Sequence, residues 1–336
     1  MKTKKILVTG GAGFMGSWLA DELIKRGHRV VSVDDLSGGF LENVNPKCKF
    51  VKLDVRDFKK LDKLIEKEKI EIIFHLAAYA AVGQSVFSPI AINDINITPM
   101  NNLLVSAVNH NIKRFIFTSS MDVYGKQKPP FNEKMPRLPD DPYGCAKSYC
   151  ERMLEIFART YNFEYVILRP HNVYGPRQNI SDPFRNVLGI WINRILKDKA
   201  PYIFGDGKQT RAFSYIEDVT SPIANAGFFQ KAKNQIINIG SDEVVTINRA
   251  CEIVQEIMHS TSKPIYLEER PCEVKYAYCT VGKSKKALGY KTNHKLRGGL
   301  KMMAEWARRV GAKKPIYRIP LEVKKKLPGV WKEKLQ

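Results

Sequence analysis

The sequence predicts an α/β fold: a Rossmann-type doubly wound parallel sheet followed by a smaller, irregular α/β C-terminal portion. Three observations support this prediction. Short apolar segments alternate with helical patterns through the first half, a glycine-rich loop follows the first of those segments, and the alternation breaks off after Pro170. The chain has 336 residues, 44% of them hydrophobic, so it can bury a sizeable core as one large domain or two modest ones.

The first half contains short apolar segments such as Ile6-Leu7-Val8, which are typical of strands in a sheet that is buried on both faces. The predicted strands span residues 5–9, 29–33, 49–53, 70–76 and 114–119. Helical spacing is found between them at residues 14–25, 58–66 and 99–109. A long helix is expected at 143–161 because Asp140-Asp141-Pro142 is a helix-starting signal. A strand at 165–168 follows that helix and is stopped by Pro170.

The second half is less regular and contains turn sequences at Gly175-Pro176, Asp182-Pro183 and Gly205-Asp206-Gly207. Helical patterns return at residues 216–229, 247–258 and 296–309. Ligands of open parallel sheets bind beyond the carboxyl ends of the strands. We therefore expect the irregular portion to cover that edge of the sheet.

A glycine-rich loop lies between the first predicted strand and the first predicted helix, and reads Thr9-Gly10-Gly11-Ala12-Gly13-Phe14-Met15-Gly16. Gly10 permits a tight turn, Gly13 lets the backbone approach a pyrophosphate, and Gly16 lets helix and strand pack closely. The helix start at Phe14 and Met15 then presents unpaired N–H groups to the phosphates. The order of strand, loop and helix predicts dinucleotide binding.

Asp34 follows the second predicted strand, 18 residues after Gly16, and Asp35 is next to it. A carboxylate at this position can accept hydrogen bonds from ribose hydroxyls and repels a 2′-phosphate, which favours NAD over NADP. No arginine follows within the next several residues to bind such a phosphate. The alternative interpretation is that these aspartates are only turn residues at a strand end.

Tyr143 and Lys147 are four residues apart, so a phenol and an ammonium share one face of the long helix. A phenol with an ordinary pKa of about 10 is a poor base at neutral pH. A nearby ammonium and the positive nicotinamide ring of oxidised cofactor both favour the phenolate, which can then take the proton of a substrate hydroxyl. This spacing alone is frequent by chance, but after a dinucleotide loop it predicts a catalytic pair.

A hydroxyl-rich segment follows the fifth predicted strand and reads Ser119-Ser120-Met121-Asp122-Val123-Tyr124-Gly125. The hydroxyl of Ser120 can hydrogen-bond the reacting oxygen, and the carboxyl of Asp122 can move a second proton. The alternative is that the hydroxyl groups simply cap the strand end.

This combination resembles the extended short-chain dehydrogenase/reductase family, and within it the NAD-dependent nucleotide-sugar epimerase/dehydratase group. The resemblance covers nearly the whole chain. The motifs that carry it are the T-G-x-x-G-x-x-G loop from Thr9, Asp34, Leu53-Asp54-Val55, His75-Leu76-Ala77-Ala78, Ser120, Tyr143 and Lys147. Residues 169–219 resemble the 4-epimerases of the group, such as UDP-glucose 4-epimerase, more than its other branches.

The resemblance implies a catalytic trio and two binding sites. The trio is Ser120, Tyr143 and Lys147. The NAD site is expected to comprise Gly10, Gly13, Phe14, Met15, Gly16, Asp34, Asp35, Asp54, Val55, Leu76, Ala77, Ala78, Tyr143 and Lys147. The nucleotide-sugar site is expected to comprise Ser120, Met121, Asp122, Asn172, Phe204, Arg211, Arg270, Glu273 and Ala277.

Further roles follow from the same resemblance. Asp54 and Val55 would contact the adenine, and Phe204 would lie against the nucleotide base. Asn172 would lie near the diphosphate, and Glu273 would accept from the nucleotide's ribose. Two arginines, Arg211 and Arg270, would clamp the diphosphate, because guanidinium forks match phosphate oxygens. The expected division is a NAD-binding domain of residues 1–170 with parts of 212–240, and a nucleotide-sugar portion of residues 171–211 and 241–336.

The sequence departs from the family pattern at Asp94 and Ile97, where many members have Asn and Gly. A more informative departure is Met121. Sugar 4,6-dehydratases of the group carry two adjacent acids after the catalytic hydroxyl, but here the pair is Met121-Asp122. Some dehydratases and the sugar-acid decarboxylases keep a single acid at the position of Asp122, whereas the 4-epimerases need neither acid.

One residue bears on the size of the substrate. Counting from Arg270 and Glu273, Ala277 falls where 4-epimerases often carry a gate residue. A large side chain there crowds a 2-N-acetyl group, and alanine leaves room. N-acetylhexosamine substrates are therefore expected to be tolerated.

The net charge of +21 is concentrated near the C-terminus. Residues 283–336 contain 17 Lys and Arg against three acids, a net charge of +14, and the first 282 residues carry only +7. A solvated basic face is the preferred interpretation over nucleic-acid binding, because no nucleic-acid motif accompanies the charge. The six cysteines show no zinc spacing and are expected to be free thiols.

The favoured function is a NAD-dependent 4-epimerase of UDP-glucose and UDP-galactose, or of their N-acetyl forms, with a transient 4-keto sugar and Tyr143 as base. The first alternative is a dehydratase or decarboxylase that uses Asp122 as an additional acid or base. A non-catalytic NAD-sensing or polyanion-binding protein is the second alternative, and the intact catalytic trio argues against it. We expect a cytoplasmic enzyme without a metal or membrane partner, and by resemblance a homodimer through the helices around 99–109 and 143–161.

Overall fold

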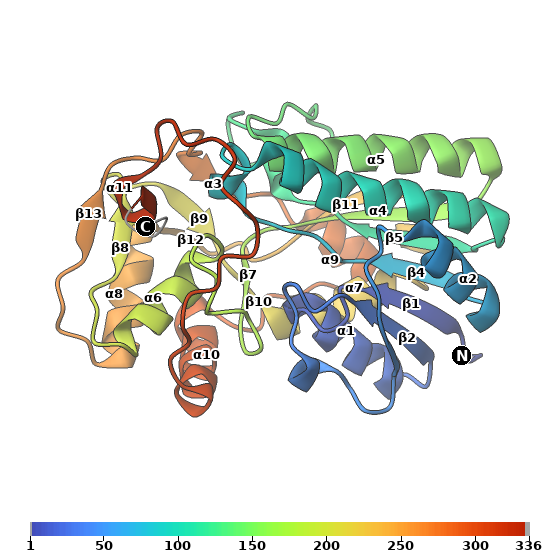
Figure 1. The fold of residues 1–336 in the computed structure, drawn as a ribbon, viewed down its shortest axis with the longest axis horizontal. Coiled ribbons are helices and arrows are strands. Elements are labelled where there is room, and N and C mark those ends of the chain that lie inside the picture. Colours follow the sequence, from blue (N-terminus) through green and yellow to red (C-terminus); the bar gives the residue numbers. More distant parts are fainter. Residues whose placement is uncertain (1, 333–336) are drawn as a thin grey trace.

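A seven-stranded parallel sheet organises the larger part of the molecule (Figure 1). The computed structural model describes residues 2–332. The strand order is β11-β6-β5-β4-β1-β2-β3. The strands are β1 (Lys5–Thr9), β2 (Arg29–Asp34), β3 (Lys49–Lys52), β4 (Ile72–His75), β5 (Arg114–Thr118), β6 (Glu164–Pro170) and β11 (Gln235–Ile239). This sheet confirms the predicted Rossmann-type fold.

Helices cover both faces of the sheet (Figure 1). One face carries α2 (Phe58–Glu68), α4 (Pro89–Asn109) and α5 (Pro142–Tyr161), and the other carries α1 (Phe14–Lys25), α7 (Ile216–Ala226) and α9 (Gly282–Leu288). Side chains alternate between the two faces of a strand, so Leu7 joins the core beneath α4 and α5 while Ile6 and Val8 join the core beneath α1. Burial on both faces explains why the strands are continuously apolar.

A smaller part lies beyond the carboxyl ends of the strands (Figure 1). It contains three small sheets, β10-β7, β12-β9-β14 and β13-β8. Its strands are β7 (Val173–Tyr174), β8 (Tyr202–Phe204), β9 (Thr210–Ala212), β10 (Ser214–Tyr215), β12 (Val244–Thr246), β13 (Ile265–Leu267) and β14 (Tyr276–Ala277). Its helices are α6 (Val187–Ile195), α8 (Ile247–Met258), α10 (Leu296–Val310) and α11 (Gly329–Lys332), and a short helix α3 (Val82–Ser85) precedes α4 in the larger part. The core beneath α1 continues into this part, and the division into two domains stays a prediction.

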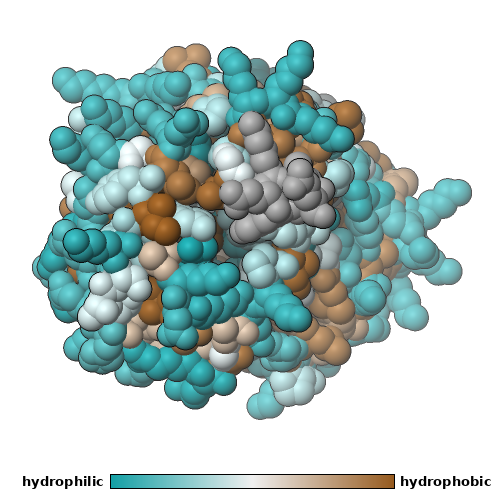
Figure 2. Space-filling model, turned by 60° about the vertical axis from the view of Figure 1, so that its left-hand side comes forward, coloured by the Kyte–Doolittle hydropathy of each residue, from teal (hydrophilic) through white to brown (hydrophobic). Residues whose placement is uncertain are grey.

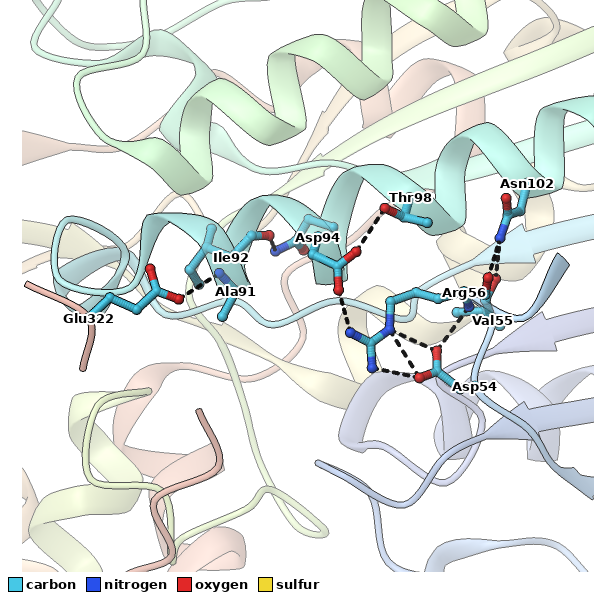
Figure 3. A network of polar contacts seen from close by, with 10 residues as sticks. Asp54, Val55, Arg56, Ala91, Ile92, Asp94, Thr98, Asn102 and Glu322 are labelled. Carbon is cyan, nitrogen blue, oxygen red and sulfur yellow. Dashed lines mark hydrogen bonds and ion pairs between the residues drawn. The ribbon is translucent and has the colours of Figure 1, made fainter. Parts of the chain in front are cut away.

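The start of one helix was predicted wrongly. The pattern at 99–109 is only the second half of α4, which begins ten residues earlier, at Pro89, and contains Pro99 in its interior. An internal proline loses one helical hydrogen bond and usually ends a helix. Here Pro99 is buried, and the helix start is held from outside: the carboxylate of Glu322 accepts from the N–H groups of Ile90 and Ala91 at 2.8 and 2.9 Å (Figure 3).

Residues 312–332 form a segment that we name the C-terminal strap. It leaves α10 at Gly311, whose φ of +70° suits glycine, and runs back across the junction of the two parts towards α3 (Figure 1). Lys324, Lys325 and Lys326 are exposed on it, whereas Leu327 and Trp331 are buried. Hydrophilic side chains cover most of the face that Figure 2 shows. Residues 333–336 of the predicted basic region lie outside the described residues.

None of the helices within residues 2–332 combines the length and the apolar character of a membrane span.

The contact between α1 and the glycine-rich loop gives a prediction about stability. A Cβ placed on Gly16 would lie 2.0 Å from the carbonyl oxygen of Gly10, and neither backbone can move away freely. Gly16→Ala is therefore expected to lower the free energy of unfolding by about 1–3 kcal/mol, measured by urea denaturation. The matched control is Gly298→Ala in α10, where a Cβ meets nothing within 4 Å. That change is expected to be neutral or stabilising by up to about 1 kcal/mol, and equal losses in both variants would contradict the packing argument.

Candidate functional site

One large cavity lies at the carboxyl edge of the sheet, between the sheet and the smaller part. Its volume is about 1090 Å³, at the upper end for small-molecule sites, so it has room for more than one ligand. Every residue that the sequence analysis assigned to the NAD site, the nucleotide-sugar site or the catalytic trio lines it. The predicted site residues thus lie around one cavity, and their roles stay predictions.

The glycine-rich loop forms one end of the cavity. Gly10 has a φ of +71° and donates from its N–H to the carbonyl of Val33 at 2.8 Å, which holds the tight turn. No side chain caps the N-terminus of α1 at Gly13, so the first N–H groups of that helix are left for a ligand. This bare helix start is the donor set that a pyrophosphate needs, and the loop therefore fits a dinucleotide.

The aspartates after β2 hold turns in addition to lining the cavity. The carboxylate of Asp34 accepts from the N–H groups of Ala12 and Leu36 at 3.1 and 2.8 Å, and burial raises its pKa above the ordinary value. Asp35 accepts from the N–H of Ser37 at 2.8 Å. Asp34 therefore supports the glycine-rich loop directly, and contact with a ribose is a further role that stays predicted.

Sequence reasoning missed how Thr9 and His75 join the ends of β1 and β4. The Thr9 hydroxyl oxygen lies 2.8 Å from His75 Nδ1 and accepts from the N–H groups of Leu76 and Ala77, both at 3.2 Å. This contact brings Ala77 so close to Gly10 that a Cβ on the glycine would lie 2.8 Å from the Ala77 nitrogen. The motif of residues 75–78 was the available signal, but its hydrogen bonds depend on a residue of another strand.

The predicted adenine end contains a three-membered ion-pair network (Figure 3). Arg56 donates to Asp54 at 2.6 Å and to Asp94 of α4 at 2.5 Å, and its guanidinium lowers the pKa of Asp54. Asn102, also on α4, donates to the carbonyl of Val55 at 3.0 Å. The unusual aspartate at position 94 therefore has a local role, because it anchors the arginine that pairs with Asp54.

The three predicted catalytic side chains meet at the carboxyl edge next to β5. Asp141 caps α5, as its sequence predicted, by accepting from the N–H of Gly144 at 3.0 Å. Lys147 donates from Nζ to the carbonyl of Thr118 at 2.9 Å, and the Ser120 hydroxyl donates to Asp122 Oδ2 at 2.6 Å. A serine, a tyrosine and a lysine are thus gathered around one point of the cavity, with an acid beside the serine.

Burial dominates the electrostatics of this group. Burial, and then the negative charge of Asp122, raise the pKa of Tyr143, while the Ser120 hydroxyl acts in the opposite direction. Burial lowers the pKa of Lys147 to about 8. Burial also raises the pKa of Asp122, against the effect of its bond to Ser120. The protein alone therefore keeps Tyr143 as a neutral phenol, and a positive charge next to the ring is needed to make it a base.

The opposite end of the cavity carries the residues predicted to bind the nucleotide. Glu273 pairs with Arg211 and with Arg270, each at 2.7 Å, and Arg270 lies over the ring of Phe204 at 4.8 Å. Asn172 has a φ of +43° and donates to the carbonyl of Ala212 at 3.0 Å. One acid therefore orients both predicted diphosphate-binding arginines, a link that sequence reasoning did not foresee.

Met121 and Ala277 belong to one small apolar cluster beside the catalytic trio. Both are almost completely buried, at 7% and 3% exposure, and both line the cavity. Ala277 is placed there by β14, which pairs with β9 next to Arg211. The wall at this position is small and apolar.

Many further residues line the cavity but were missed. Among them are Tyr79, Asp182, Phe184, Arg185, Arg318 and Trp331. Arg318 and Trp331 belong to the C-terminal strap, which the sequence analysis treated only as charge. The available signal in the sequence was a pair of apolar residues, Leu327 and Trp331, spaced four apart in a basic segment. Both are buried in the structure.

Residues 6–240 match the model of the NAD dependent epimerase/dehydratase family. The chain belongs to that family. Because membership covers the glycine-rich loop and the catalytic trio, and because the loop fits a dinucleotide, NAD is the cofactor of this enzyme. Among residues 2–332 no three His, Cys, Asp or Glu side chains are grouped as a metal site would require.

Relatives within the family differ in what they do. A putative UDP-glucose 4-epimerase of Methanocaldococcus jannaschii is 38% identical over 303 residues, which are 90% of this chain and 97% of the relative. A UDP-N-acetyl-alpha-D-glucosaminuronate decarboxylase of Bacillus cytotoxicus is 31% identical, over 91% of this chain and 98% of the relative. The crystal structure of UDP-glucose 4-epimerase from Thermotoga maritima with UDP-glucose is similar with a TM-score of 0.86 at 35% identity, over 91% and 99% of the two chains. This epimerase/dehydratase chain is thus similar to nucleotide-sugar epimerases and to a decarboxylase.

The buried ammonium of Lys147 predicts a pH-dependent cost to stability. Its pKa falls from 10.5 to about 8, so the unfolded chain binds more protons between those values and the stability of the wild type rises with pH there. In NAD-free protein, Lys147→Met is expected to be more stable than wild type at pH 7 by on the order of 3 kcal/mol. The difference should shrink as the pH rises from about 8 to 10.5. Urea denaturation at several pH values measures it.

Lys63→Met is the matched control, because Lys63 is exposed on α2 and no cavity surrounds it. Its effect on the free energy of unfolding is expected to be small. A Lys147→Met variant that is less stable than wild type at pH 7 would show that burial of the Lys147 ammonium does not destabilise the folded protein.

Proposed function

We propose that this enzyme is a 4-epimerase of UDP-sugars, acting on UDP-glucose and UDP-galactose or on their N-acetyl forms. The observation that carries the proposal is the set of residues that line one large cavity. The glycine-rich loop lies at one end, the pair Arg211 and Arg270 at the other, and Ser120 and Tyr143 between them. A dinucleotide and a nucleotide diphosphate sugar, placed from the two ends, would meet at the catalytic trio.

The proposed steps use the side chains of the trio. Tyr143 takes the proton of the sugar's C4 hydroxyl, and the Ser120 hydroxyl donates a hydrogen bond to the same oxygen as it becomes a carbonyl. Lys147 supplies a positive charge and holds the nicotinamide ribose. Bound NAD supplies the hydride acceptor and donor, and a positive ring that favours the Tyr143 phenolate. After the 4-keto sugar has turned over, Tyr143 returns the proton and the C4 configuration is inverted.

The wall beside the trio supports epimerisation over dehydration. Elimination of water from a 4-keto sugar needs one group to remove a proton and another to protonate the leaving hydroxyl. Met121 stands where the second acid of the dehydratases is expected, and it packs in an apolar cluster with Ala277. An apolar wall offers no fixed partner to the sugar, which suits a ring that must turn over.

One observation favours a second candidate, a dehydratase or decarboxylase. Asp122 is hydrogen-bonded to Ser120 at 2.6 Å, and burial raises its pKa, a shift in the direction that an acid catalyst needs. The relatives include a decarboxylase. The two candidates make different products from the same trio, so products decide between them.

We also infer a homodimer through α4 and α5, as the resemblance implies. These helices pack against each other over their length and leave Val105, Tyr149 and Tyr161 exposed at 39%, 39% and 53%. Exposed apolar side chains on one helix pair are typical of a contact surface.

The first prediction is about products. Incubation with UDP-glucose, UDP-N-acetylglucosamine, UDP-glucuronate, GDP-mannose and dTDP-glucose, followed by chromatography with mass detection, is expected to give a new peak of unchanged mass from a UDP-sugar. Tyr143→Phe is expected to lower kcat by about 100-fold to 10,000-fold with a nearly unchanged KM. Loss of water or of carbon dioxide from the sugar would contradict the epimerase and support the second candidate.

Asp122→Asn is the companion variant of that experiment. In an epimerase the amide keeps a hydrogen bond with Ser120, and kcat is expected to stay within about ten-fold of wild type, since no proton passes through the carboxyl. In a dehydratase or decarboxylase the same change should abolish turnover. Ser119→Ala serves as a control for damage to the strand end, since the Ser119 hydroxyl donates its hydrogen bond to Glu151 and not to Asp122.

A further prediction concerns the size of the sugar. Ala277→Tyr fills the small apolar wall beside Met121, so turnover of the UDP-N-acetylhexosamine is expected to fall at least about ten-fold relative to the UDP-hexose. The ratio of kcat/KM for the two substrates measures the effect. An unchanged ratio would show that position 277 does not select the 2-substituent. Ala277→Ser, which adds little volume, is the control.

A further inference from the structure

The C-terminal strap forms part of the cavity wall and is held at both ends. At its start, Lys313 exchanges hydrogen bonds with the side chain of Asn193 on α6, at 2.8 and 2.9 Å. In its middle, Glu322 caps α4, and its N–H donates to the carbonyl of Phe87 at 2.7 Å. At its end, the Trp331 ring packs edge-on against Phe184 with ring centres 4.8 Å apart. The strap therefore ties α6 of the smaller part to α4 of the larger part across the mouth of the cavity.

One cation of the strap is turned inward. Lys313, Lys314 and Lys324 are exposed to solvent, whereas Arg318 is half-buried and lines the cavity. Its Nε is buried and has no hydrogen-bond partner among the described residues. A guanidinium in such a place costs free energy unless a ligand or water meets the free N–H groups.

A second guanidinium lies beside it. Arg185 pairs with Asp182 at 2.7 Å and lies over the ring of Tyr79 at 4.7 Å. Burial, and then the charge of Arg185, lower the pKa of Arg318. Among the described residues, no carboxylate lies within 4.0 Å of Arg318. Asp182 and Asp35 act on Arg318 only from a distance, so the two neighbouring guanidiniums share one directly paired acid and Arg318 has no direct anionic partner among the described residues.

The position of the pair relates it to the glycine-rich loop. The Arg318 guanidinium lies 5.9 Å from the centre of the Phe40 ring, and Phe40 donates from its N–H to the carbonyl of Ala12 at 3.0 Å. Arg185 Nη2 lies 3.7 Å from where a Cβ of Gly38 would be. Both arginines therefore stand against the segment 38–40, which itself packs on the loop.

We propose that Arg318 and Arg185 form a diphosphate-binding pair, and that the ligand is the pyrophosphate of NAD. Guanidinium groups present forked donors that match phosphate oxygens. Two such groups that line a cavity and have only one directly paired carboxylate between them are therefore suited to bind an anion. The cavity holds two diphosphates in the proposed function, but Arg211 and Arg270 already stand at the nucleotide-sugar end. The pair beside segment 38–40 stands at the cofactor end. The strap then retains NAD, with Arg318 as its cofactor-binding residue.

This proposal rests on NAD binding and not on which sugar is the substrate, so it is tested by binding alone. In the full chain, freed of bound nucleotide, ADP-ribose and UDP are titrated separately by calorimetry. Arg318→Gln, which keeps length and removes charge, is expected to raise the Kd of ADP-ribose about 10-fold to 100-fold and that of UDP by less than about two-fold. Arg318→Lys is expected to lose less affinity for ADP-ribose than Arg318→Gln does. When both variants are loaded with NAD and passed through gel filtration, Arg318→Lys is expected to retain more of its NAD.

Lys314→Ala is the matched control, since it removes an exposed charge of the same strap. It is expected to leave both affinities unchanged. An unchanged affinity of Arg318→Gln for ADP-ribose would overturn the proposal, and so would a loss for UDP alone, which would assign the pair to the substrate's diphosphate. An equal loss of affinity for ADP-ribose in Arg318→Gln and Lys314→Ala would also overturn the proposal, because the loss would then come from long-range electrostatic attraction and not from direct contact. Thermal unfolding of each variant shows that the strap is still folded.

Discussion

A buried ion pair fixes α5, which carries the predicted catalytic Tyr143 and Lys147, to the sheet, and the geometry of the site depends on this pair. Glu151 of α5 and Arg169 at the end of β6 are 0% and 1% exposed and lie 2.6 Å apart. The same carboxylate accepts from the Ser119 hydroxyl at 2.5 Å, so α5, β5 and β6 meet at one acid. Breaking such a pair by removing one partner costs about 3–5 kcal/mol, because the other charge stays buried without compensation. The helix therefore has one register against the strands.

The catalytic positions follow from this register. Tyr143, Lys147 and Glu151 are spaced by four, so they share the face of α5 that the ion pair turns toward the sheet. Ser120 follows Ser119 in extended backbone, with φ −150° and ψ 157°, so neighbouring side chains point in opposite directions. Since Ser119 is held by Glu151, Ser120 points into the cavity. One acid outside the reaction thus aims the serine, the lysine and the tyrosine.

Local sequence was sufficient to predict the strand, loop and helix at the start of the chain. The bounds of β1 and α1 agree with the prediction at every residue, because the apolar run, the glycines and the helical spacing are contiguous. Residues fixed by distant partners could not be found in this way. Local sequence predicts a helix start at Pro99, because nothing near Pro89 in the sequence reveals the contact with Glu322, more than two hundred residues away. Arg318 looked like one more surface charge, because only the packing of the strap turns it inward.

The strap also imposes an order of events on synthesis. Chains emerge from the ribosome N-terminus first, and domains begin to fold as they emerge. Among the described residues that line the cavity, those of the strap are made last. The glycine-rich loop, the aspartates after β2 and the catalytic helix thus exist before the outer wall does. A nascent chain of this enzyme lacks the wall that the strap supplies, and that wall is complete only when Trp331 packs against Phe184.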